Sequence, residues 1–167
     1  IVEHSVTMAI MVPPMYNLLA RRGEPSVMQT VHDFISGGAP IPQPVAQAFY
    51  DRFHHPVREG YGLTEASPVV SVLPSDRLKY LTVGPAIPGV EVKIMTDREG
   101  PYQPGTVGEL LVRGDNVMKG YWHREEETKK VLEPDGWLHT GELAYMDEDR
   151  FIYIVDRLKD LIIVNGE

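Results

Sequence analysis

The stretch VREGYGLTE, residues Val57–Glu65, runs from a short extended segment into glycine. We expect a strand over Val57–Glu59 and a loop from Gly60, because glycine allows backbone conformations and close approaches that side chains prevent. The same order occurs upstream, where an expected strand over Val31–Ser36 runs into a Gly-Gly pair. With a further apolar segment at Val6–Val12, this pattern is typical of an α/β sheet.

Two expected helices lie between these strands. Pro13 and Pro14 precede a helix expected over Met15–Arg22, and Gly23 follows it, the usual asymmetry of helix ends. A second helix is expected over Pro42–Phe53, because apolar side chains recur there at every fourth position. The first half therefore predicts an α/β unit.

The second half of the chain predicts a β-rich unit that begins after a boundary at Leu81–Gly84. Apolar residues alternate with charged ones over Val90–Ile94, as in a half-buried strand. The other expected elements are strands over Glu109–Arg113, Glu142–Met146, Phe151–Val155 and Leu161–Val164, and a short helix over Glu125–Val131. The turn Asp147–Arg150 makes a hairpin of two of these strands.

Composition excludes several classes of protein. The 167 residues suit about one domain, and a hydrophobic content of 43% is enough for a core. The absence of cysteine excludes disulfides and thiolate chemistry. A net charge of −8 without a basic stripe argues against a nucleic-acid partner, and no charge-free apolar run is long enough to predict a membrane span.

The residues that follow Gly60 suggest binding of a nucleotide. Tyr61 offers a flat face on which a base can stack. Thr64 can donate to a phosphate oxygen, and Glu65 can hold Mg²⁺, which takes carboxylate and phosphate oxygens together. The alternative for Glu65 is an ordinary surface acid. The Gly37-Gly38 loop leaves an expected neighbouring strand, so both loops could line one pocket, and the alternative is that they are two ordinary turns.

A third candidate lies in WLHTGE, residues 137–142. Glu142 follows an expected glycine turn and could accept hydrogen bonds from both hydroxyls of a ribose. Arg157 could pair with a phosphate or a carboxylate, and a surface ion pair is the alternative. His139 is expected to support this motif at most, and Trp122 is expected to pack in a core or between domains.

The motifs SGGAP, GYGLTE, VGELLVRGDNVMKGYW, WLHTGE and DRLKDLI occur in this order. Together they resemble the AMP-forming acyl-CoA synthetases of the adenylate-forming superfamily, with the fatty-acid–CoA ligases as the nearest branch. The resemblance runs from about Val6 to the end of the chain. It implies the latter part of the large N-terminal domain of such an enzyme, with an α/β subdomain over 1–82, a β-rich subdomain over 83–156 and a hinge within 157–167.

The resemblance implies a cytoplasmic two-step ligase. A carboxylic acid, here expected to be a fatty acid, reacts with ATP to give acyl-AMP and pyrophosphate, with Mg²⁺ on the nucleotide. The thiol of CoA then displaces AMP to form the thioester. The 167 residues are expected to be inactive alone, because neither the family's phosphate loop nor its C-terminal lysine is found in them.

The resemblance also assigns residues by motif. Gly37, Gly38 and Ala39 are expected to line the adenine and acyl pocket. The remaining assignments are Tyr61 and Gly62 at the adenosine, Thr64 at the phosphates, Glu65 at Mg²⁺, Glu142 at the ribose, Arg157 at the nucleotide and Lys159 at the hinge.

Two positions depart from the family pattern. Glu142 stands where the family has Asp, which moves the carboxylate by about 1 Å, a scale on which positioning matters. Arg150 stands where the hairpin turn usually has Gly. The alternatives are a peptide-synthetase-type adenylation domain, and a non-catalytic adenylate-binding or structural protein in which ribose binding is lost.

Overall fold

The α/β part of the chain contains a sheet whose strand order is β1-β2-β3-β4. The computed structural model describes residues 1–157. The strands of this sheet are β1 Met8–Met11, β2 Asp33–Ser36, β3 Val57–Gly62 and β4 Val69–Val72. The helices are α1 Pro13–Arg22 and α2 Gln43–Phe53, and short 3-10 turns occupy η1 Val2–His4, η2 Pro25–Met28 and η3 Thr64–Ala66. The first three strands are parallel, as the α/β pattern predicts, and β4 is antiparallel to β3.

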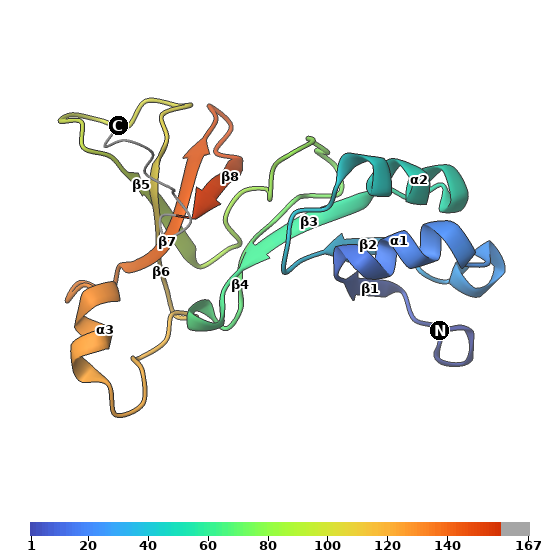
Figure 1. Cartoon of the computed structure of the whole chain (residues 1–167), viewed down its shortest axis with the longest axis horizontal. Helices are drawn as coiled ribbons and strands as arrows, with labels where there is room; N and C mark the ends of the chain where they lie inside the picture. The colour runs from blue at the N-terminus through green and yellow to red at the C-terminus, as the bar shows by residue number, and fades with distance from the viewer. Residues whose placement is uncertain (158–167) are drawn as a thin grey trace, which may run out of the picture.

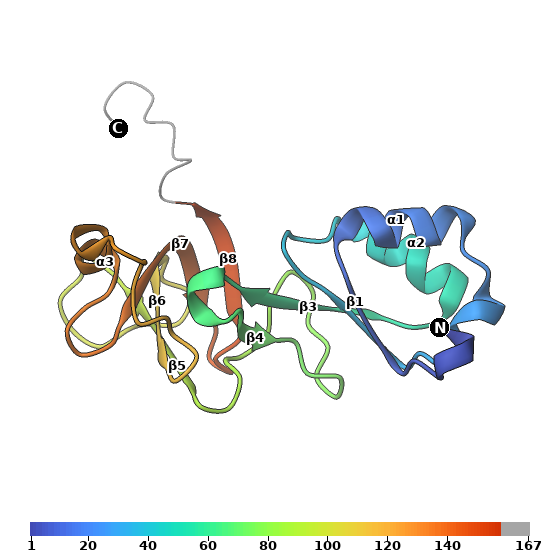
Figure 2. The ribbon, with the colours of Figure 1, turned by 90° about the horizontal axis from the view of Figure 1, so that it is seen from below.

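Helices α1 and α2 lie on the same face of this sheet (Figure 2). Phe49 of α2 is fully buried, with its ring 5.0 Å from that of Phe34 in β2 and 5.1 Å from that of Tyr16 in α1. Phe53, one turn further along α2, stacks on Phe49 at 4.6 Å. The predicted apolar face of the second helix is therefore confirmed as the face that packs on the sheet.

Gly23 ends α1 as predicted, but for a different physical reason. Its φ of −68° is open to any residue, so left-handed backbone is not what favours glycine here. A Cβ at this position would lie 2.7 Å from the ring of Phe53 and 2.8 Å from the carbonyl oxygen of Leu19. Glycine is favoured because the end of α1 passes close to α2.

The β-rich part is an antiparallel sheet with the strand order β5-β6-β7-β8 (Figure 1). Its strands are β5 Val90–Met95, β6 Gly108–Gly114, β7 Leu138–Met146 and β8 Ile152–Arg157, and helix α3 spans Glu125–Val131. The short helix has the predicted bounds, and the predicted hairpin is confirmed as β7–β8. The strand expected over Leu161–Val164 lies outside the described residues.

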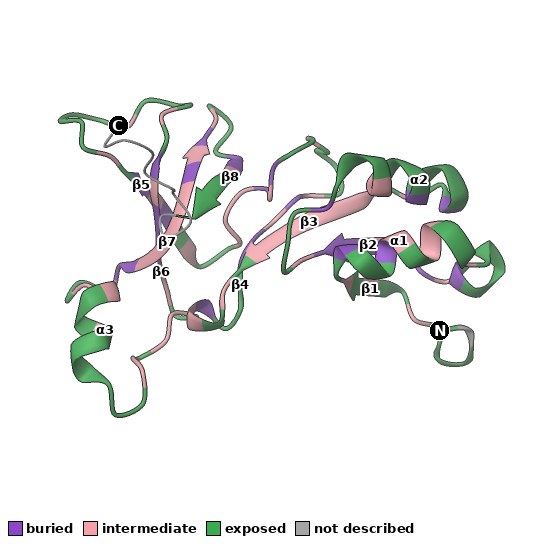
Figure 3. Ribbon diagram, in the orientation of Figure 1, coloured by how far each residue is buried: buried purple, intermediate pink, exposed green. Residues whose placement is uncertain are grey.

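One buried cluster joins the two sheets. Val70 of β4 and Ala66 of η3 are both fully buried and pack with apolar residues of the second sheet. Figure 3 shows buried residues along β6 and β7 and mostly exposed residues on α3. The α/β helices pack around a separate cluster that includes Tyr16 and Phe49. The molecule thus has two cores, and β3 runs from one toward the other (Figure 1).

The structure answers two further questions, on the turn that contains Arg150 and on the packing of Trp122. Arg150 takes the left-handed backbone, φ 64°, that glycine usually supplies, so the β7–β8 turn keeps its geometry without glycine. Trp122 is 86% exposed, so the expectation that it packs in a core is wrong within the described chain. Within residues 1–157, no helix combines the length and apolar character that crossing a membrane requires.

Candidate functional site

The predicted loops after β2 and β3 leave neighbouring strands. Ser36 at the end of β2 pairs with Glu59 in β3, so the next residues of both strands lie side by side. A Cβ on Gly37 would be 3.8 Å from the carbonyl oxygen of Gly60, and Gly38 has a φ of +81°. The Gly37–Ala39 segment therefore exposes backbone beside β3, where a flat ligand can approach it.

The expectation that Gly60 begins a loop is wrong. Strand β3 continues through Gly62, because β4 folds back and pairs with it: Gly60 with Val72, Tyr61 with Ser71. The register shifts at Gly62, which pairs with Val69. Gly62 is needed here because a Cβ would lie 1.9 Å from the carbonyl oxygen of Pro68. Tyr61 is thus held in a strand by its pairing with Ser71 of β4.

Glu59 connects the two glycine-containing segments, and the sequence did not identify it. Its Oε2 accepts a hydrogen bond from the backbone N–H of Ile41 at 3.1 Å, just beyond the Gly37–Ala39 loop. Burial raises the pKa of Glu59, and the bond from Ile41 offsets part of that rise. The one feature of the sequence that could have indicated this role of Glu59 is its position directly before Gly60.

Thr64 and Glu65 lie in the 3-10 turn η3, directly after β3. Thr64 is exposed, whereas Glu65 is half-buried and its Oε1 accepts a hydrogen bond from the hydroxyl of Tyr121 at 2.8 Å. The backbone N–H of Met118 donates to the carbonyl oxygen of Glu65 at 2.8 Å. The side-chain amide of Asn116 donates to the carbonyl oxygen of Ala66 in this turn and to that of Val69 at the start of β4, each at 2.9 Å. The segment after β6 therefore fixes the turn that carries both residues.

The expectation that a glycine turn precedes Glu142 is wrong, because Gly141 lies within strand β7, at a bulge. Leu111 of β6 pairs with His139 and Glu109 with Leu143, so β7 carries extra residues opposite Leu110. The hydroxyl of Thr140 donates to the carbonyl oxygen of Leu110 at 2.7 Å. It also accepts from the N–H of Glu142 at 3.1 Å. Such bulges re-aim side chains, in this case Glu142.

Arg157 pairs with the carboxylate of Glu142. The two residues are cross-strand partners in β7 and β8, and Arg157 Nε donates to Glu142 Oε1 at 3.1 Å. The side chain of Glu142 is 14% exposed, and that of Arg157 is 68% exposed. The structure thus brings these two predicted site residues together. The predicted hinge residue Lys159 lies outside the described residues.

Tyr61 joins the two halves of the site. Burial raises the pKa of its phenol, the carboxylates of Glu142 and Glu65 add to the rise, and Thr140 and Arg157 oppose it. Glu65 is close to Tyr61 in sequence, whereas Thr140, Glu142 and Arg157 come from β7 and β8, and the fold brings all of them near enough to act on one hydroxyl. Among the described residues that hydroxyl is buried without a hydrogen-bond partner.

These residues fit a magnesium nucleotide by their chemistry. The described residues contain no group of three or more acidic, histidine or cysteine side chains that could hold a metal by themselves. Mg²⁺ needs only one or two carboxylates when phosphate oxygens and water complete its shell, which is what Glu65 offers. The bare backbone at Gly37–Gly38 and the flat ring of Tyr61 suit an aromatic base.

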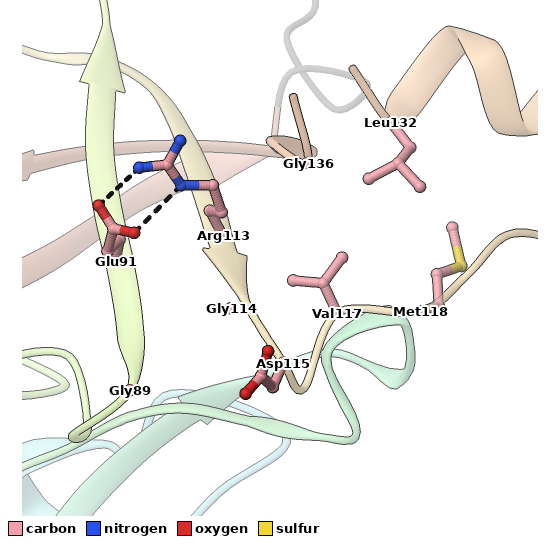
Figure 4. A pocket seen from close by; sticks show the side chains of 9 residues that line it. All are labelled: Gly89, Glu91, Arg113, Gly114, Asp115, Val117, Met118, Leu132 and Gly136. Atoms are coloured by element: carbon pink, nitrogen blue, oxygen red, sulfur yellow. Dashed lines mark hydrogen bonds and ion pairs between the residues drawn. The ribbon is translucent and has the colours of Figure 1, made fainter. Parts of the chain in front are cut away.

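A cavity of about 400 Å³ lies elsewhere, between strands β5 and β6, the segment after β6 and the segment that joins α3 to β7 (Figure 4). One wall is the ion pair of Glu91 with Arg113, in which Nε and Nη2 of Arg113 donate to the two carboxylate oxygens at 3.1 and 2.8 Å. Arg113 lowers the pKa of Glu91 through these bonds. None of the predicted site residues lines this cavity, so it is separate from the site described above.

Comparison with known proteins agrees with this fold. The family described as AMP-binding enzyme matches residues 1–122, and the chain belongs to that family. It is 44% identical over 139 residues to a long-chain-fatty-acid–CoA ligase of Salmonella typhimurium, covering 82% of this chain and 24% of the relative.

Two further relatives cover nearly the whole chain. A feruloyl-CoA synthase of an Amycolatopsis species is 39% identical, covering 99% of this chain and 34% of the relative. The crystal structure of ATP-bound MatB from Rhodopseudomonas palustris superposes with a TM-score of 0.86 at 33% identity, covering 97% of this chain and 33% of MatB. The chain therefore spans about a quarter to a third of the relatives it matches. These matches confirm the predicted family and fold class.

Proposed function

We propose that the chain supplies the nucleotide-binding part of an ATP-dependent, AMP-forming acid–CoA ligase. In this reaction a carboxylate oxygen attacks the α-phosphorus of ATP, pyrophosphate leaves, and the thiol of CoA then displaces AMP from the acyl-AMP. The observation that carries the proposal is the grouping of Glu65, Glu142 and Arg157 near the phenol of Tyr61, with Arg157 Nε bonded to Glu142 Oε1 at 3.1 Å. Family membership and the ATP-bound neighbour support it.

Each residue has a proposed role that its surroundings allow. The Gly37–Ala39 backbone and the ring of Tyr61 contact the adenosine. Glu142 accepts from the ribose hydroxyls, and the extra methylene relative to Asp is accommodated because the bulge sets where its side chain begins. Arg157, mostly exposed, exchanges part of its pairing with Glu142 for the nucleotide.

Thr64 and Glu65 are proposed to act at the phosphates. Thr64 is exposed on η3 and donates to a phosphate oxygen, while Glu65 would hold Mg²⁺, which neutralises charge on the nucleotide when bound. Tyr121 takes one side of the Glu65 carboxylate and leaves the other for the metal. The hinge role of Lys159 is proposed from its motif alone.

Titration with a non-hydrolysable acyl-adenylate mimic, followed by amide chemical shifts, tests this proposal. We expect saturable shifts at Gly37–Ala39, Tyr61–Glu65 and Thr140–Glu142. Glu142→Ala should weaken binding by about tenfold, because a hydrogen bond to a charged group is lost. Glu126→Ala, which removes an exposed carboxylate of α3, should not. A folded spectrum without shifts at these positions would contradict the proposal.

The proposed acid is a fatty acid, because the fatty-acid–CoA ligase is more similar to this chain than the feruloyl-CoA synthase is. Turnover needs residues beyond these 167, since the chain spans only 24% of the former relative. If the 167-residue chain alone releases pyrophosphate in a reaction that depends on ATP and a fatty acid, that requirement is refuted. In a full-length protein, a preference for ferulate over palmitate would refute the proposed acid.

A further inference from the structure

His139 lies between two carboxylates, one on each side of its ring. Its Nδ1 is 2.9 Å from Glu109 Oε2, in β6, and its Nε2 is 2.9 Å from Glu133 Oε1, in the segment after α3. Ionised carboxylates only accept hydrogen bonds, so both ring nitrogens donate only when the imidazole carries both protons. This geometry selects the charged form of His139.

Glu109 also holds the bulge that leads to Glu142. Its second oxygen, Oε1, accepts a hydrogen bond from the backbone N–H of Gly141 at 3.1 Å. Gly141 has a φ of +71°, and its neighbour Thr140 is tied to β6 through its hydroxyl. One carboxylate therefore connects the imidazole of His139 to the residue that immediately precedes Glu142.

The charges around His139 favour its protonation. The ring is partly buried, which works against a charge, but the bonds from Glu109 and Glu133 outweigh that effect and raise its pKa. Within the described residues, the charged groups that act on it are Glu109 from β6 and Glu133 from the α3–β7 segment. The arrangement is a clamp of one cation and two anions, Glu109–His139–Glu133.

We infer that the Glu109–His139–Glu133 clamp is a positioning device that fixes the Thr140–Glu142 bulge and thereby the carboxylate proposed to hold the ribose. The inference rests on the proposed nucleotide site, and none of the clamp residues touches the nucleotide in it. Loss of one proton from His139 leaves one ring nitrogen without a hydrogen to donate, so the imidazole can no longer hold Glu109 and Glu133 at the same time.

Protonation of His139 and nucleotide binding are consequently linked. The clamp is complete below the pKa of His139, which lies above the usual value of about 6.5. It opens as the pH rises through that pKa. Nucleotide affinity should therefore fall with rising pH, and by reciprocity bound nucleotide should raise the pKa of His139.

Glu133→Gln is the variant that isolates the charge. The amide oxygen can still accept from His139 Nε2, and the backbone contact of Glu133 with Trp137 does not involve the side chain. Glu126→Gln is the matched control, because its carboxylate pairs with Lys129 on the exposed face of α3. The imidazole and amide resonances of both variants and the parent are followed against pH, with AMP as the ligand.

In the parent, we expect the amides of Gly141 and Glu142 to follow the titration of His139. AMP binding should weaken by about fivefold or more above its pKa. Glu133→Gln should move both the amide titration and the loss of AMP affinity to lower pH. Glu126→Gln should leave both at the pH values of the parent. If the amide chemical shifts of Gly141 and Glu142 do not change as His139 titrates, the inference is overturned.

An unchanged pH dependence of AMP binding in Glu133→Gln, despite a lower pKa of His139, would overturn it equally. A parent chain that binds no AMP at any pH contradicts the proposed function instead. The clamp is then judged by the amide resonances of Gly141 and Glu142 alone, which need no ligand.

Discussion

The carboxylate of Glu65 is held by a phenol from a segment 56 residues away in the sequence. Its residue type and its place after Thr64 predicted a metal ligand, but nothing near it in sequence predicted Tyr121 as a partner. Likewise, nothing near Tyr61 in sequence predicted that Thr140 would act on its phenol. Side-chain chemistry can be read from a motif, whereas the groups that orient the side chain come from wherever the fold places them.

Tyr121→Phe tests whether this phenol positions Glu65. We expect the free energy of unfolding to fall by about 1–2 kcal/mol, because a hydrogen bond to a charged group is lost. Affinity for Mg²⁺-bound ATP should fall several-fold, while affinity for AMP without Mg²⁺ should stay the same. Calorimetric titration in the presence and absence of Mg²⁺ measures both.

Tyr80→Phe is the matched control, because that ring is exposed and loses the same hydroxyl. It should change neither affinity. Equal losses of ATP and AMP affinity in Tyr121→Phe would mean that the phenol supports the turn as a whole and does not act through the metal carboxylate.

Strand β3 illustrates what a local pattern can and cannot specify about an element. The pattern gave its start at Val57, because the extended segment follows a helix ending at Phe53. Its continuation through Gly62 depends on β4, whose residues Val69–Val72 supply the hydrogen-bonding partner. A glycine pair favours a loop only while no other strand pairs with it.

Gly60→Ala and Gly62→Ala should differ sharply in stability. A Cβ at Gly60 would meet its nearest atom at 3.4 Å, an ordinary contact, so we expect a change below about 1 kcal/mol. A Cβ at Gly62 would lie 1.9 Å from the carbonyl oxygen of Pro68, so we expect a loss of about 3 kcal/mol or more. Urea denaturation of both variants measures the difference, and similar losses would contradict the β3–β4 register.

The whole molecule is built on two cores that share β3. Phe49 belongs to the cluster under α1 and α2, whereas Val70 packs with the sheet β5–β8 although it precedes the expected boundary at Leu81–Gly84 in sequence. Regions with separate cores can unfold separately. We therefore expect two transitions, with β4 unfolding together with the second sheet.

Phe49→Ala and Val70→Ala test this division. Phe49→Ala should destabilise β2 by about 3–5 kcal/mol and leave β6 nearly unchanged. Val70→Ala should destabilise β6 by about 2 kcal/mol and spare β2. Amide exchange of Phe34 and Leu110 reports on the two regions. Equal effects of either variant on both amides would show a single cooperative unit.

The amino-acid sequence by itself determined the local elements of this protein and its family. Helix α3, the apolar face of α2 and the β7–β8 hairpin follow from side-chain periodicity and turn chemistry, which act over a few residues. The ordered motifs pointed to the family that the chain matches over residues 1–122.

Only the tertiary structure decided how the motifs meet. It set the bulge before Glu142, the pairing that extends β3, and the approach of Tyr61 to Thr140 and Arg157. The physical reason is that strand pairing and burial join residues far apart in the chain. Their energies depend on a partner that no local window of sequence contains.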